Sequence, residues 1–174
     1  MNRVLAIEKV LFDFTSADGM PAWQIVNDTV MGGVSTSSFE PAGRAAVFRG
    51  VVSLENNGGF ASVRSSPARH NLGGCDGFII RLRGDGHRYK FTVRTAAGFD
   101  PPLYRCAFST MRGVWDESRL AFKDFVPAHR GQVLAGVPPL QPTKIASVGF
   151  LIADKQAGPF QLEIAWVKAS PVTG

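Results

Sequence analysis

Residues 23–35 read WQIVNDTVMGGVS, a stretch that is neither helix-like nor strand-like throughout. Its apolar residues alternate irregularly with turn formers. The side chains of Asn27-Asp28 can bond to nearby backbone, and Gly32-Gly33 can adopt backbone angles closed to other residues. We predict a shaped, packed loop in which Trp23 and Met31 close one end of the fold. Loops of this kind on a rigid scaffold often carry function, so it is the first candidate site.

Outside this loop, glycine and proline separate short apolar runs, which is typical of all-β proteins. No window sustains the spacing of an amphipathic helix. We predict strands over residues 10–14, 34–39, 45–54, 59–65, 77–83, 88–95, 103–109, 119–122, 145–153 and 160–168. Without crossover helices, these strands favour an all-β jelly-roll β-sandwich. We expect one such domain over residues 1–174, with residues 123–143 as a long loop over one end.

Two turns are predicted to form hairpins. Gly84-Asp85-Gly86 lies between alternating runs at 78–83 and 88–94, and Asp-Gly at this place is a strong hairpin signal. This geometry explains Asp85 better than a catalytic role does. Residues 154–159 are predicted to join the last two strands in the same way.

Basic residues alternate with core residues along three of these strands. If the strands are neighbours in one sheet, the alternation gathers one set of side chains on a single face, namely Arg81, Arg83, Lys90, Arg94 and Arg105, with Arg64 beside them. An ordinary solvated face and a face for an anionic partner both remain open. Nucleic acid is not favoured, because the aromatic residues of these strands alternate inward.

A second glycine-rich loop spans Asn56-Asn57-Gly58-Gly59. It can be a tight bend with a bulge, or a rim whose backbone amides face a ligand beside the first loop. The candidate binding surface therefore comprises Asn27, Asp28, Asn56, Asn57, Arg64, Arg81, Arg94 and Arg105. Gly33 and Gly59 are expected to resist substitution wherever they hold a positive φ.

The sequence offers little for catalysis. No GxSxG, P-loop, zinc or Asp-rich calcium pattern occurs, and His70, His87 and His129 are expected at the surface. We expect no catalytic residue, no metal and no cofactor, and we expect Cys75 and Cys106 to be free thiols. The formal charge of +5 permits an anionic partner without requiring one. No apolar run could span a bilayer, and residues 1–10 show no signal-peptide pattern.

An ordered set of motifs runs through nearly the whole chain. It comprises Trp23 with residues 27–35, 58–64, 83–86 with Tyr89, Tyr104 with Phe108, 125–127 with 130–131, 147–150 with 153–154, and 158–160 with 162–164. This set resembles the complex I intermediate-associated protein 30 (CIA30) family. The resemblance implies a galactose-binding-domain-like jelly roll. It also implies a non-enzymatic assembly factor, or chaperone, for NADH:ubiquinone oxidoreductase (respiratory complex I).

The partner implied is therefore a protein, from the subunits or intermediates of complex I. The expected location is the cytoplasm of a bacterium, at the inner membrane wherever a partner holds the chain there. The alternative is a carbohydrate-binding or other ligand-binding module without an assembly role. A hydrolase whose site assembles only in space is a third hypothesis. The residues expected in the core are Trp23, Met31, Phe60, Phe91, Phe150, Phe160 and Trp166.

Overall fold

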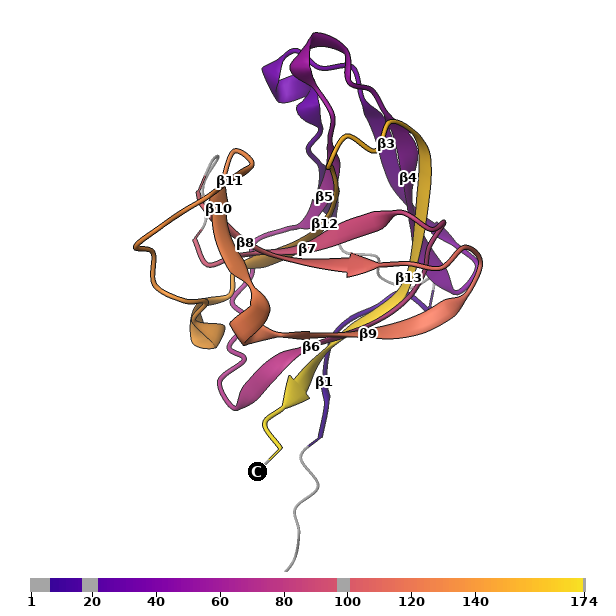
Figure 1. The fold of residues 1–174 in the computed structure, drawn as a ribbon. Coiled ribbons are helices and arrows are strands. Elements are labelled where there is room, and N and C mark those ends of the chain that lie inside the picture. Colours follow the sequence, from indigo (N-terminus) through magenta and orange to yellow (C-terminus); the bar gives the residue numbers. More distant parts are fainter. Residues whose placement is uncertain (1–6, 17–21, 97–100, 174) are drawn as a thin grey trace, which may run out of the picture.

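The computed structural model describes residues 7–16, 22–96 and 101–173, and strands dominate them (Figure 1). Thirteen strands form two antiparallel sheets, and the helical segments in this part of the chain are four short 3-10 turns. The predicted all-β class is confirmed. Ten of the thirteen strands match predicted ones, although their ends differ by a few residues.

The six-stranded sheet is built around the longest strand. Its order is β3 (Thr36–Ala42), β4 (Ala45–Val52), β13 (Gly158–Pro171), β6 (Cys75–Arg83) and β9 (Trp115–Ala121), with β1 (Lys9–Asp13) paired to the second half of β13. β13 pairs with β6 along most of its length. On its other side it pairs first with β4 and then with β1.

The seven-stranded sheet contains the three strands that were not predicted. Its order is β11 (Gln132–Val133), β10 (Val126–His129), β8 (Leu103–Ser109), β7 (Arg88–Arg94), β12 (Ser147–Ile152), β5 (Ala61–Ser65) and β2 (Trp23–Ile25). β2, β10 and β11 are short strands at the two ends of this sheet. The prediction of an irregular loop over 123–143 is therefore wrong in part, because β10 and β11 lie inside it.

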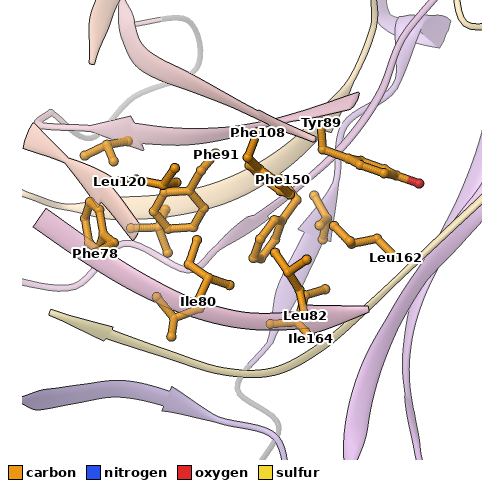
Figure 2. Packing of buried hydrophobic residues seen from close by; sticks show 14 of the residues in the cluster. Phe78, Ile80, Leu82, Tyr89, Phe91, Phe108, Leu120, Phe150, Leu162 and Ile164 are labelled. Carbon is orange, nitrogen blue, oxygen red and sulfur yellow. The ribbon is translucent and has the colours of Figure 1, made fainter. Parts of the chain in front are cut away.

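The core lies between the two sheets. Figure 2 shows Phe78, Ile80 and Leu82 of β6 facing Phe91 of β7 and Phe150 of β12. The Phe91 ring is 4.8 Å from the Phe78 ring and 5.3 Å from the Phe150 ring, in edge-to-face contacts. The alternation along each strand that predicted this core is thus confirmed for Phe91 and Phe150, and also for Phe160.

Both predicted hairpins are wrong, because each connection crosses from one sheet to the other. β6 pairs with β13 and β9, whereas β7 pairs with β8 and β12. Similarly, β12 belongs to the seven-stranded sheet and β13 to the six-stranded one. An Asp-Gly turn reverses the chain but does not determine which strands then pair. Repeated crossings of this kind between two antiparallel sheets are the jelly-roll arrangement, as predicted.

The sequence alternation predicted Trp166 in the core, but a bulge in β13 places it outside the core. The register shifts between Ile164 and Trp166, and Ala165 is the extra buried residue. Beyond the bulge, Val167 is fully buried while Trp166 is only half-buried. The Lys168 ammonium lies 4.0 Å from the centre of the Trp166 ring, a cation–π contact on the outer face.

The end-closing loop is also less buried than expected. Met31 is 61% exposed and the neighbouring Val30 is 63% exposed, because Asp28 alone is buried within the 3-10 turn η1 (Asp28–Met31). Trp23 and Phe60 are half-buried rather than buried. Trp23 still packs on Phe39, with ring centres 4.9 Å apart. Closure of this end therefore depends on Trp23 and its aromatic neighbours and not on Met31.

One glycine inside the seven-stranded sheet provides a test of the strand packing. A Cβ at Gly149 of β12 would lie 2.3 Å from the carbonyl oxygen of Val63 on β5. Gly149→Ala should therefore lower the free energy of unfolding by about 1–3 kcal/mol, measured by urea titration. The control Ala107→Ser, at an exposed position of β8, should change it by less than about 0.5 kcal/mol. Equal effects would contradict the packing described.

Candidate functional site

The carboxylate of Asp28 is fully buried and accepts hydrogen bonds from two separate loops. The backbone N–H and the hydroxyl of Ser35 donate to it at 3.0 and 2.5 Å. The backbone N–H groups of Gly59 and Phe60 donate at 2.7 and 3.3 Å. The Ser35 hydroxyl oxygen in turn accepts the backbone N–H of Ser53 at 2.9 Å. A single side chain thereby ties η1, the start of β3, the end of β4 and the loop before β5.

Two glycines fit closely around this carboxylate. A Cβ at Gly33 would lie 2.4 Å from Cγ of Asp28, and one at Gly58 would lie 2.5 Å from Oδ2. Gly33 was expected to resist substitution if it held a positive φ, but its φ is not positive and its constraint is this contact. Gly59 does hold a positive φ of 128°. The pairs Gly32-Gly33 and Gly58-Gly59 therefore leave room for a buried charge between two loops.

Asn27 and Asp28 were predicted as part of a binding surface, and their burial corrects that role. Asn27 is 7% exposed, and its Oδ1 accepts hydrogen bonds from the Ser37 hydroxyl at 2.8 Å and the Ser62 N–H at 3.2 Å. With its carboxylate fully enclosed, Asp28 cannot touch a partner. Both residues shape the loops from inside.

The protonation state of Asp28 follows from two opposing effects. Burial raises the pKa of its carboxyl group, because desolvation penalises the charged form. The hydrogen bonds from Ser35, Gly59 and Phe60 act in the other direction and together prevail, so the pKa lies below its ordinary value. Asp28 is therefore ionised at neutral pH.

Asn56 and Asn57 lie on the solvent side of the loops that surround the Asp28 carboxylate. Both are exposed and have left-handed backbone angles, with φ of 56° and 58°. The Asn56 amide donates to the carbonyl oxygen of Gly32 at 3.2 Å, which joins the two loops again. The loop is thus a tight bend, and its asparagines are the exposed part of the predicted loop surface.

The predicted basic face is divided between the two sheets, which corrects its grouping. Arg81 and Arg83 lie on β6 in the six-stranded sheet, whereas Arg64, Lys90, Arg94 and Arg105 lie on β5, β7 and β8 in the other. The error follows directly from the mistaken β6–β7 hairpin. The structure unites Arg64, Arg94 and Arg105 on one face and leaves Arg81 on the other.

Arg81 and Arg83 have acidic and aromatic neighbours within their own sheet. Arg83 makes a two-pronged hydrogen-bonded pair with Glu163, and its second contact is 2.9 Å. Arg81 lies 4.0 Å from Glu117. Both guanidinium groups also lie over the ring of Trp115, at 5.6 Å for Arg81 and 5.0 Å for Arg83. The charge on this outer face is therefore balanced locally.

Arg64 and Arg105 have only neutral partners among the described residues. Arg64 donates to the side-chain oxygen of Gln24 at 3.2 and 3.3 Å, and Arg105 donates to the carbonyl oxygen of Gly131 at 3.4 Å. Lys90, on the same face, is neutralised by Asp154 at 2.9 Å. The seven-stranded sheet thus presents two arginines that no described carboxylate compensates.

Asp85 and Tyr89, two groups suited to acid–base chemistry, are held in a structural contact with each other. Asp85 accepts hydrogen bonds from the Gln161 N–H at 2.7 Å and the Tyr89 hydroxyl at 2.9 Å, which fastens the crossing between the sheets. Burial raises the pKa of Tyr89 and those of the Cys75 and Cys106 thiols. Both cysteines are free, as expected.

The histidines are half-buried rather than at the surface. Burial lowers the pKa of His70, and His87 Nδ1 lies 2.8 Å from an oxygen of Asp85. In residues 7–16, 22–96 and 101–173, no three His, Cys, Asp or Glu side chains are grouped so that they could hold a metal ion. None of the helical segments described is long and apolar enough to cross a membrane.

The two antiparallel sheets and the crossings between them define the chain as a jelly-roll β-sandwich. The chain belongs to the complex I intermediate-associated protein 30 (CIA30) family, whose profile matches residues 12–164. It is similar to the mitochondrial complex I intermediate-associated protein 30 of Mus musculus, with 26% identity over 91% of this chain and 55% of the mouse protein. The corresponding Neurospora crassa protein is 29% identical over 48% of this chain and 30% of its own length. The matched region thus spans about half of the length of the mouse protein and about a third of the length of the Neurospora crassa protein.

Solved structures support the fold independently. The family 11 carbohydrate-binding module of a Clostridium thermocellum cellulase superposes with a TM-score of 0.71 at 15% identity, covering 95% of both chains. An agarase superposes with a TM-score of 0.65 at 12% identity, covering 95% of this chain and 25% of the enzyme. At such identities the likeness concerns the architecture alone.

Removing the charge of Asp28 tests its structural role. Asp28→Asn should lower the free energy of unfolding by about 3 kcal/mol at neutral pH, because hydrogen bonds to a charged group are lost and an amide donor then faces other donors. Urea titration measures the effect. The exposed Asp76→Asn should change it by less than about 0.5 kcal/mol. A similarly small change in both variants would contradict the claim that the hydrogen bonds of Asp28 stabilise the fold.

The lowered pKa of Asp28 also predicts a pH dependence. A carboxyl group whose pKa is lower in the folded state stabilises the fold above its unfolded value, about 3.9, and that contribution disappears as pH falls through the folded pKa. The stability difference between wild type and Asp28→Asn should therefore be constant near neutrality and shrink below about pH 4. A difference that grows in acid would contradict this assignment.

Proposed function

We propose that the chain is a non-catalytic protein-binding module that acts as an assembly factor, or chaperone, for NADH:ubiquinone oxidoreductase. The observation that carries the proposal is the match to the family profile over residues 12–164. The name of the mouse relative, a complex I intermediate-associated protein, supplies the partner class. On this proposal the chain works as one domain in the bacterial cytoplasm and reaches the inner membrane through its partner.

The contacts of the polar residues support a binding role over a catalytic one. The enclosed carboxylates of Asp28 and Asp85 have their oxygens occupied by backbone N–H and hydroxyl donors. The raised pKa values of Cys75 and Cys106 disfavour the thiolate that a cysteine nucleophile requires. With these groups engaged inside the fold, we infer that the chain acts by contacting a partner through its surface.

Affinity capture from native membranes tests the assembly role. The tagged chain should co-purify complex I subunits, and a strain that lacks the gene should show reduced assembled complex I on native gels. Re-expression of the wild-type chain should restore it. Normal complex I in the deletion strain, together with no captured subunit, would refute the assembly role.

A carbohydrate-binding module is the second candidate, and the fold of the family 11 module is the observation that favours it. Sugar binders stack aromatic rings on their ligand. Here the half-exposed Trp115 and Trp166 already have Arg81, Arg83 and Lys168 over their rings. A β-1,3-1,4-mixed-linked tetrasaccharide, which a family 11 module is known to hold, should therefore show no binding by calorimetry. Saturable binding would favour this second candidate.

A further inference from the structure

The two sheets differ sharply in charge. The strands of the six-stranded sheet carry both signs in equal number, with Lys9, Arg49, Arg81, Arg83, Arg119 and Lys168 against Asp13, Glu40, Asp76, Asp116, Glu117 and Glu163. On the strands of the seven-stranded sheet, every Lys, Arg, Asp or Glu position is basic, namely Arg64, Arg88, Lys90, Arg94 and Arg105. The net positive charge of the strands is therefore concentrated in one sheet.

The register aligns two of these arginines across the sheet. One transverse row, from β2 to β10, reads Gln24, Arg64, Gly149, Thr92, Arg105 and Val126. Arg64 and Arg105 are three strand spacings apart, which is about 14 Å between their backbones. Between them lie Gly149, which has no side chain, and Thr92, which is 4% exposed. The two central residues thus form a floor of small, buried positions with an arginine on either side.

The chemistry of this outer face selects among anionic ligands. All aromatic residues of β5, β7, β8 and β12 belong to the core cluster, namely Tyr89, Phe91, Tyr104, Phe108 and Phe150. A sugar ring or a nucleic-acid base would find no aromatic surface for stacking on these strands. Guanidinium groups bind carboxylates through paired hydrogen bonds. Because Arg64 and Arg105 now donate only to neutral oxygens, a carboxylate would give each a stronger partner.

We propose that the outer face of the seven-stranded sheet, across Arg64, Gly149, Thr92 and Arg105, is a docking surface for an acidic segment of a partner protein. The segment lies over the Gly149–Thr92 floor, and its carboxylates pair with Arg64 on one side and Arg105 on the other. This inference rests on the proposed protein-binding function and deepens it, since it names the face and the partner chemistry. The six-stranded sheet, whose charges are balanced, is not part of the surface.

A synthetic octaglutamate peptide is the direct probe, with backbone NMR shifts of the full chain as the readout. We expect saturable shifts at Arg64, Thr92, Arg105 and Gly149, weakening as salt is raised. The variant Arg64→Gln/Arg105→Gln should lose at least about tenfold in affinity, because close charge pairs at an interface are coupled this strongly.

The matched control removes the same number of positive charges, two, from the six-stranded sheet. Arg49→Gln/Arg119→Gln should bind the peptide within about twofold of wild type, since these arginines lie outside the proposed surface. Thermal unfolding of both double variants establishes that each is folded. Equal weakening in both would show attraction by net charge alone and overturn the proposal, as would the absence of saturable binding by wild type.

Other anionic probes complete the test. A sulfated oligosaccharide, a single-stranded RNA or a vesicle with anionic lipid that binds this face more tightly than octaglutamate would overturn the acidic-segment assignment. Membrane capture with the same variants separates the two proposals. Undiminished capture of complex I subunits by Arg64→Gln/Arg105→Gln would refute this surface and leave the assembly role standing. Selective octaglutamate binding without any captured subunit would support this surface and refute the assembly role.

Discussion

The buried carboxylate of Asp28 is the interaction on which the end of this sandwich depends. An isolated charge in a protein interior is strongly unfavourable unless hydrogen bonds satisfy it. Asp28 meets that demand with donors from Ser35, Gly59 and Phe60, which come from loops on either side of β3 and β4. Because Gly33 and Gly58 admit no Cβ, both loops must pass close to the carboxylate. The requirement to satisfy one charge thereby sets the path of the chain where it crosses from the six-stranded to the seven-stranded sheet.

This arrangement separates architecture from function. The loop over residues 23–35, which looked most like an active site, uses the side chains of Asn27 and Asp28 internally and exposes apolar side chains such as Val30. The neighbouring loop exposes Asn56 and Asn57. The sheets supply the accessible polar surface, and they differ. On the six-stranded sheet, Arg83 is satisfied by Glu163 and by the Trp115 ring. On the seven-stranded sheet, Arg64 and Arg105 flank a floor without large side chains, which is the surface we propose for an acidic partner segment.

Local patterns predicted most of the strands but not their partners. Period-2 alternation identifies a strand such as β7 because it reflects which face is buried, and it correctly assigned Phe91 and Phe150 to the core. Strand pairing is a non-local property. The Gly84-Asp85-Gly86 turn therefore predicted a hairpin, although the chain crosses from one sheet to the other there. One extra residue at Ala165 reversed the expected side of Trp166. Asn27-Asp28 looked like local turn formers, although Gly32-Gly33 and Gly58-Gly59 were the available sign of a close contact between two loops.

Amide hydrogen exchange at Ser35, Gly59 and Phe60 tests the central claim about Asp28 most directly. If the carboxylate holds these N–H groups, they should exchange as slowly as the core amides of Phe91 and Phe150, because their release then requires global unfolding. Exchange of these loop amides at the fast rate of exposed loops, while the core amides stay protected, would contradict the account.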